Sequence, residues 1–280
     1  MASPAHVGGS LGCDGMHGDE FLGLRSTHNP HRWFLPVVPG IATGGRFLFG
    51  GCGLAAAIVA MESVVGRPAV WATAQYLSFA MVDEVMNIDV TVATHGHYTS
   101  QARVVAHVGD REILTVNAAL GARRSPFEGT WGSAPAVPSP SECLDRRNRI
   151  EFSGSIMDRL EIRLVKGAQF DEFPSASTPD GTSALWVRLP DIEMSAAALA
   201  VLGDYVPYGI AQALGTWTRS NSLDNTLRIL RVVPSEWVLL DIAVHAVHDG
   251  FGHGRVHLWS EDGTHLATAS QTAVVRELET

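Results

Sequence analysis

One polar side chain stands alone in an otherwise apolar row near the end of the sequence. If the run 264–275 forms a strand, Gln271 shares one face with Ala267, Ala269 and Ala273. A buried amide without partners costs a few kcal/mol, so Gln271 must hydrogen-bond to something specific. That partner is either the backbone, which would make Gln271 structural, or another polar group of a site.

Two further residues could carry chemistry at predicted helix starts. Asp204 precedes a predicted helix with Pro207 in its first turn, and its carboxylate could take a proton from water. The structural alternative is that Asp204 caps this helix, and the two roles are compatible. Cys52 stands at an earlier helix start, where a thiol becomes more acidic and could act as a nucleophile. A small buried residue is the commoner reason for a cysteine there.

Glycines and histidines suggest two other kinds of site, both of which we set aside. The segment Gly51-Cys52-Gly53-Leu54-Ala55-Ala56 matches a dinucleotide-binding fingerprint. That fold requires buried parallel strands, whereas the runs that follow alternate and join as hairpins. The twelve histidines include no His-x-x-x-His pair on a helix with a Glu, so no metal site is predicted.

The chain repeats weakly on the two sides of a segment rich in Pro and Ser at 123–145. A shift of 152 positions takes Gly51 to Gly203 and Arg103 to Arg255 without a gap. Each half offers a mostly apolar helix, at 53–62 and at 205–216, as expected of a buried helix. Strand-like runs follow each helix at 70–80, 85–95, 98–108 and 112–121, and at 223–233, 236–247, 253–260 and 264–275.

The final strands of both halves join through the tight turns Gly109-Asp110 and Asp262-Gly263. Strands joined in this way are antiparallel. The pattern predicts an α+β fold of the tandem (double) hot-dog type, with each antiparallel sheet wrapped around a central helix. The expected divisions are a poorly structured N-terminal segment at 1–30, an N-terminal hot-dog at 31–122, a linker at 123–148 and a C-terminal hot-dog at 149–280.

Composition limits the class of protein. The net charge is −9 with no long basic run, which excludes a nucleic-acid partner. Three scattered cysteines are too few for a disulfide framework or a zinc site. The longest apolar run, Gly53 to Met61, is far shorter than the roughly 20 residues of a membrane span, and the N-terminus does not have the pattern of a signal peptide. A cytoplasmic protein is therefore expected.

Several short stretches stand out when they are taken in order. They are Phe49-Gly50-Gly51, Trp186-Val187-Arg188, Gly203-Asp204, Ser222-Leu223-Asp224-Asn225, Leu266-Ala267-Thr268-Ala269-Ser270-Gln271 and Arg276. In this order and spacing, from about residue 45 to residue 276, the sequence resembles the acyl-CoA thioesterase II family of double hot-dog proteins.

The resemblance implies a hydrolase that splits acyl-CoA into free acid and CoA without a cofactor. In that family an Asp, a Ser or Thr, and a Gln bind and activate the hydrolytic water, and these match Asp204, Ser222 and Gln271. Main-chain N–H groups at Gly50, Gly51 and Cys52 would stabilise the oxyanion. The family also implies an acyl-CoA partner and leaves room for a homo-oligomer.

The sequence departs from the family at two places near the expected substrate entrance. Cys52 stands where Gln is usual, and the stretch from His95 to Ser100 replaces an Asp-Gly-Arg-Ser-like segment. The two halves are also chemically unequal. Subtracting 152 from Asp204, Ser222 and Gln271 leads to Cys52, Val70 and Ala119, which cannot hold water in the same way.

Two other functions stay open. A hot-dog hydratase or dehydratase acting on enoyl thioesters usually pairs an Asp with a His one helical turn later, where this chain has Tyr208 and Gly209. A non-catalytic protein that binds acyl-CoA or another acyl ligand would not need the Asp, Ser and Gln set.

Overall fold

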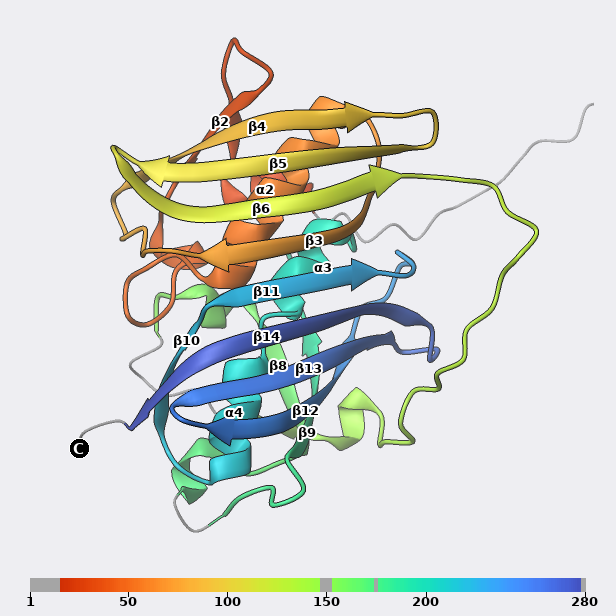
Figure 1. Cartoon of the computed structure of the whole chain (residues 1–280). Coiled ribbons are helices and arrows are strands. Elements are labelled where there is room, and N and C mark those ends of the chain that lie inside the picture. The colour runs from red at the N-terminus through yellow and green to blue at the C-terminus, as the bar shows by residue number, and fades with distance from the viewer. Residues whose placement is uncertain (1–15, 147–152, 174–175, 278–280) are drawn as a thin grey trace, which may run out of the picture.

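The computed structural model describes residues 16–146, 153–173 and 176–277. Within these ranges the chain forms one antiparallel sheet of fourteen strands, with the long helix α2 lying behind it in the view of Figure 1. The strand order is β1-β2-β4-β5-β6-β3-β11-β14-β13-β12-β9-β8-β7, and β10 pairs with β14. Both halves therefore contribute to a single continuous sheet.

The bounds of the elements follow the chain in two sets. The first set is α1 (Gly18–Leu22), β1 (Arg25–Ser26), β2 (Arg32–Pro36), α2 (Gly50–Val65), β3 (Ala69–Tyr76), β4 (Val85–His95), β5 (Thr99–Val108) and β6 (Arg111–Gly121). The second set is β7 (Leu144–Asp145), β8 (Glu161–Lys166), β9 (Thr182–Arg188), α3 (Ala196–Leu202), α4 (Val206–Leu214), β10 (Thr218–Ser222), β11 (Asp224–Ile229), β12 (Val238–His248), β13 (Phe251–Ser260) and β14 (His265–Glu277).

Helix α2 is apolar on nearly every side because protein surrounds it. It lies against strands β3, β4, β5 and β6 and against helix α3, and Leu54, Ile58 and Met61 are fully buried. The helix ends at Gly66, which adopts a φ of 68° that side chains with a Cβ rarely accept. The helix predicted at 53–62 is confirmed, with three more residues at each end. No helix in the described ranges is long and apolar enough to span a bilayer.

The repeat predicted from the sequence recurs in the elements. Strands β5 and β13 are displaced by 152 residues at both ends, and the hairpin turns have Gly109 and Gly263 at φ values of 57° and 83°. The helices are less alike. In the second half the chain breaks between α3 and α4, and α4 ends before Gly215, so the helix predicted at 205–216 is slightly too long at both ends.

The two halves meet where strands β3 and β11 pair. Thr73 lies opposite Thr226 at the middle of this pairing, and their hydroxyl oxygens are 3.0 Å apart. The ladder of backbone hydrogen bonds runs through this joint, so each half supplies the neighbouring strand that the other would otherwise lack (Figure 1).

The N-terminal segment differs in part from what we expected. Residues 1–15 lie outside the described ranges, but α1 and β1 fall within the segment 1–30 that we expected to be poorly structured. Phe21 and Leu22 are buried, and the guanidinium of Arg159 lies 3.6 Å from the centroid of the Phe21 ring. The apolar side chains hold the segment, because their burial offsets the entropy of ordering it.

The segment between the halves packs on the sheet face opposite the main core. Trp186, Trp237 and Trp259 form a second apolar cluster there, against which Ala134 and Val137 pack. The indole of Trp186 donates to the carbonyl oxygen of Pro138 at 2.9 Å. The Pro-rich run therefore shields aromatic surface from water as well as connecting the halves.

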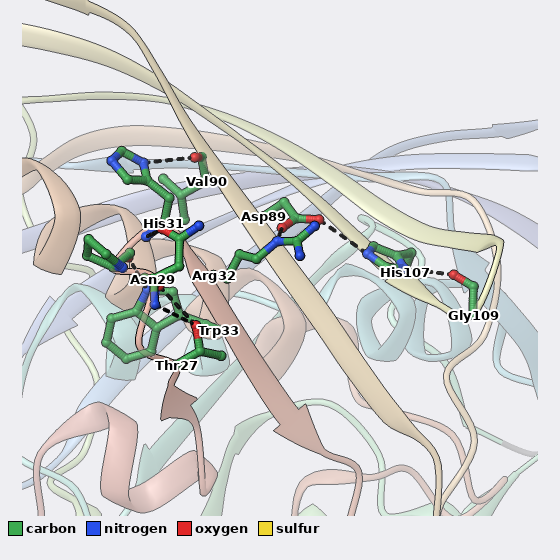
Figure 2. A network of polar contacts seen from close by, with 10 residues as sticks. Thr27, Asn29, His31, Arg32, Trp33, Asp89, Val90, His107 and Gly109 are labelled. Atoms are coloured by element: carbon green, nitrogen blue, oxygen red, sulfur yellow. Dashed lines mark hydrogen bonds and ion pairs between the residues drawn. The ribbon is translucent and has the colours of Figure 1, made fainter.

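Two histidines belong to a surface network at the outer edge of the first half (Figure 2). Arg32 on β2 donates to one carboxylate oxygen of Asp89 on β4 at 2.8 Å, and His107 on β5 lies 3.2 Å from the other. His31 contacts the carbonyl oxygen of Val90 at 3.1 Å. These contacts tie three neighbouring strands together, which is a structural role for both histidines.

The close approach of α2 and α3 gives a stability prediction. A Cβ on Gly51 would lie 2.8 Å from the carbonyl oxygen of Ala200, so Gly51→Ala forces two helices apart. We expect the free energy of unfolding to fall by about 1–3 kcal/mol in chemical denaturation. Ser63→Ala on the exposed side of the same helix is the control and should change it by less than about 0.5 kcal/mol. An equal midpoint for both variants would contradict the prediction.

Candidate active site

Asp204 lies in the short break between α3 and α4, and its carboxylate points at the start of α2. Its Oδ2 accepts a hydrogen bond from the N–H of Gly51 at 2.6 Å. Asp204 does not cap its own helix, because Tyr205 is the N-cap of α4 and makes no side-chain cap bond. Instead the carboxylate of the second half caps the central helix of the first, where the helix dipole favours a negative charge.

Gln271 holds the other oxygen of the same carboxylate. Its Nε2 donates to Asp204 Oδ1 at 2.5 Å and to Ser222 Oγ at 3.0 Å, while its Oε1 accepts from the N–H of Val206 at 3.0 Å. Gln271 is only 3% exposed, as its place in an apolar row predicted. The sequence left open whether the partner of Gln271 is the backbone or another polar group of a site. Gln271 has partners of both kinds.

Ser222 ends β10, opposite Ala273 on β14. The structure therefore brings Asp204, Ser222 and Gln271 together in one hydrogen-bonded network, although they are far apart in sequence. They come from the break between two helices, an edge strand and a central strand.

Burial dominates the electrostatics of this chain of residues. Loss of water around Asp204 raises the pKa of its carboxyl above the ordinary value of 3.8, and the hydrogen bonds from Gln271 and Gly51 offset part of that rise. A carboxylate with a raised pKa is a stronger proton acceptor than an exposed one. This is the direction that a general base requires.

The carboxylate opens onto a cavity of about 300 Å³. Its walls are mainly apolar and come from both halves and from the segment after the linker. They include Phe47, Leu48, Phe49, Phe79, Ile113, Leu114, Met157 and Pro207, with Ser222, Tyr76 and Tyr205 as polar members. Such a space suits a flexible apolar chain whose reactive end lies at Asp204.

Tyr76 is a candidate that the sequence reasoning missed. Its hydroxyl is buried beside the side-chain amide of Asn225, and the residue lines the cavity beside Gly50. The point that a Cβ on Gly50 would occupy is 2.7 Å from Asp204 Oδ2 and 3.1 Å from the Tyr76 hydroxyl. Burial raises the pKa of Tyr76, so the phenol stays protonated and can donate. The sequence signal for this arrangement is Gly50, because its lack of a side chain leaves room for both the carboxylate of Asp204 and the hydroxyl of Tyr76.

The residues expected at the start of α2 have different environments. Gly50 lines the cavity, and its N–H has no acceptor among the described residues. The N–H of Gly51 is not available to a substrate, because it already donates to Asp204. Cys52 is fully buried and burial raises the pKa of its thiol, so it lacks the properties of a thiolate nucleophile.

The second half alone supplies the polar set. At the positions displaced by 152 residues, Cys52 is buried, Val70 is 42% exposed and Ala119 is apolar. The strands after α2 are antiparallel, which confirms that its glycines do not belong to a dinucleotide-binding fold. Across the described ranges, no cluster of three His, Cys, Asp or Glu side chains could hold a metal ion.

Comparisons with known proteins agree with this arrangement. A family model described as the acyl-CoA thioesterase C-terminal domain matches residues 133–275, just over half of the chain. The chain therefore belongs to the acyl-CoA thioesterase family. A protein of Novosphingobium aromaticivorans assigned as a thioesterase is 31% identical, with a TM-score of 0.80 over 90% of this chain and 98% of its own. No curated protein sequence matches the chain.

Other solved structures show the same fold at lower identity. A protein with a hot-dog fold from Alicyclobacillus acidocaldarius is 21% identical, with a TM-score of 0.82 over 94% of this chain and 98% of its own. An acyl-CoA thioesterase II from Mycobacterium marinum is 18% identical, with a TM-score of 0.73 over 94% of this chain and 99% of its own. The chain thus has a hot-dog type of fold.

The raised pKa of Asp204 predicts how stability depends on pH. Between the ordinary value of 3.8 and the raised pKa, the folded protein keeps a proton that the unfolded chain has lost. The stability that Asp204 contributes is therefore greatest below 3.8 and declines as pH rises through the folded-state pKa. The test is urea denaturation of the wild type and of Asp204→Asn at several pH values across this window. The unfolding free energy of the wild type, relative to that of the variant, should fall as pH rises. A shift in the opposite direction would mean a lowered pKa.

Proposed function

We propose that this protein hydrolyses acyl-CoA thioesters to free acid and CoA by direct attack of an activated water. The observation that carries the proposal is the buried chain of Asp204, Gln271 and Ser222 at the wall of an apolar cavity. Family membership gives the reaction class, and the geometry supplies a base beside a space for an acyl chain. No covalent intermediate is needed.

In this proposal Asp204 takes the proton of the attacking water as the C–O bond forms, and gives it to the CoA sulfur when the C–S bond breaks. Both hydrogens of Gln271 Nε2 are engaged with Asp204 and Ser222, so Gln271 positions these two side chains instead of donating to the water as we expected. Ser222 accepts from Gln271 and keeps its own hydroxyl hydrogen for the water or the substrate. The bond from Val206 to Gln271 Oε1 fixes which way the amide faces.

Attack of water on the thioester carbon places a negative charge on the carbonyl oxygen. Hydrogen-bond donors other than the N–H of Gly51 must stabilise this oxyanion. The N–H of Gly50, which has no acceptor among the described residues, and the hydroxyl of Tyr76, which lies beside the side-chain amide of Asn225, both line the cavity next to Asp204. We assign the carbonyl oxygen to these two donors. Donors already fixed in a site shielded from water stabilise developing charge without having to reorganise.

The site is composite in this proposal. A tandem pair of hot-dog units, 31–122 and 149–280 joined by 123–148, places the donors of the first unit against the base of the second. The constant displacement of 152 residues and the joint between β3 and β11 support this division.

The test is the release of free thiol from short, medium and long acyl-CoA substrates without added metal or nucleotide. We expect Asp204→Asn to lower kcat by about 10²–10⁴, because the amide cannot take a proton from water. Gln271→Ala should lose less, since the base is kept. Cys52→Ala should stay within about one order of magnitude of the wild type, because no intermediate passes through sulfur.

The outcomes separate the alternatives. Binding of acyl-CoA without turnover by the wild type would favour an acyl-ligand binding protein. Hydration of an enoyl thioester without thiol release would favour a hydratase. A dead Cys52→Ala variant beside an active Asp204→Asn variant would move the chemistry to the first half and overturn the assignment.

Tyr76→Phe tests the proposed oxyanion donor. Removing this hydroxyl should lower kcat by about 10²–10³ while acyl-CoA still binds, because the donor acts mainly on the developing charge. The free energy of unfolding should fall by no more than about 1 kcal/mol, since the hydroxyl loses at most one contact, to the amide of Asn225. Tyr98→Phe, on an exposed residue outside the cavity, is the control. Equal kcat for both variants would remove Tyr76 from the mechanism.

A further inference from the structure

Two arginines face each other at the edge of the sheet beside the cavity. Arg219 on β10 lies directly opposite Arg276 on β14, an arrangement in which like charges repel. Arg276 donates to Asn221 Oδ1 at 3.3 Å, and within the described residues neither arginine is paired with a carboxylate. In contrast, Arg111 and Arg188 pair with Glu84 and Glu161. Fold stability does not explain the opposed pair.

Both arginines line a second pocket of about 640 Å³, a size ordinary for small-molecule sites. The remaining polar lining consists of Thr43, Tyr208, Thr218, Ser220 and Asn221, and no Asp or Glu is among the lining residues. Phe47, Phe79, Pro207 and Asn221 line this pocket and the cavity of Asp204 alike. The second pocket is therefore continuous with the first and adds the two arginines to its lining.

Charge and shape indicate the ligand class. The chain as a whole carries a net charge of −9, so an anionic substrate requires a local positive region to approach. Arginine binds phosphate through two parallel hydrogen bonds. Trp217, whose ring meets Phe173 edge-on at 5.5 Å between centroids, adds an aromatic surface of the kind on which nucleobases stack.

We propose that this second pocket binds the phosphorylated nucleotide end of CoA, with Arg219 and Arg276 on its phosphates and Trp217 beside the adenine. The inference rests on the proposed function and names the part of the substrate that the cavity of Asp204 does not hold. The acyl chain occupies the apolar cavity, the thioester lies at Asp204, and the nucleotide lies between β10 and the end of β14.

The experiment compares acyl-CoA with the matching acyl-pantetheine, which carries the same thioester without the nucleotide. In the double variant Arg219→Ala/Arg276→Ala, KM for acyl-CoA should rise about tenfold or more with kcat within about twofold. The kinetics of acyl-pantetheine should be unchanged. Arg228→Ala, at an exposed arginine of β11 that lines neither pocket, is the matched control and should alter neither substrate.

One further measurement needs no variant, and a second uses a more conservative one. For the wild type, added salt should raise KM for acyl-CoA and leave KM for acyl-pantetheine nearly flat, because only the nucleotide contact is between charges. Calorimetric titration with adenosine 3′,5′-bisphosphate should show binding that Arg219→Gln/Arg276→Gln weakens about tenfold or more.

The failures are distinguishable. If the wild type hydrolyses neither thioester, the proposed function is wrong. If it hydrolyses acyl-CoA and the arginine variants match it, the function stands and the nucleotide site is wrong. A double variant impaired only on acyl chains carried by a carrier protein would make the pair a protein-docking surface and also overturn the proposal.

Discussion

The hydrogen bond from the N–H of Gly51 to the carboxylate of Asp204 is the contact on which the rest of the site depends. It places a buried negative charge from one half of the chain at the positive end of the central helix of the other half. Without a side chain at Gly50, the carboxylate can approach this close. One contact thus satisfies an unpaired donor of a helix start and fixes the relative position of the two halves at the cavity.

Hydrogen bonds and apolar side chains around Asp204 hold its carboxylate in place and shield it from water. Gln271 engages one oxygen of Asp204 and is itself held by Val206, so the carboxylate cannot rotate without breaking several bonds. The apolar walls exclude water and thereby raise the pKa of Asp204. A fold that only had to be stable would pair such a charge with a cation or replace it by an apolar residue, since a buried unpaired carboxylate is costly.

The sequence predicted the eight strands that follow the two helices and their antiparallel hairpins, because alternation and glycine turns are local signals. The eight predicted runs did not include the remaining strands β1, β2, β7, β8, β9 and β10. It also predicted that Gln271 would be buried with specific partners, since one polar residue in an apolar row is unusual. It did not predict that Asp204 would cap α2 instead of α4, or that the N–H of Gly51 would already be engaged. Those depend on how two helices far apart in sequence approach each other. The Tyr76 hydroxyl was missed because its place beside Gly50 depends on how the end of β3 packs against the start of α2.

Joining both halves in one polypeptide has an evolutionary consequence. In a dimer of identical subunits, every mutation appears twice, so each of the two equivalent sites must accept it. Here the counterpart of Asp204 could become Cys52, a fully buried packing residue, without loss of the remaining polar set. The continuous pairing of β3 with β11 keeps the halves in register while their amino-acid sequences diverge. Joining the halves in one chain allows each to specialise, so that in the proposed mechanism one half supplies the oxyanion donors and the other the base.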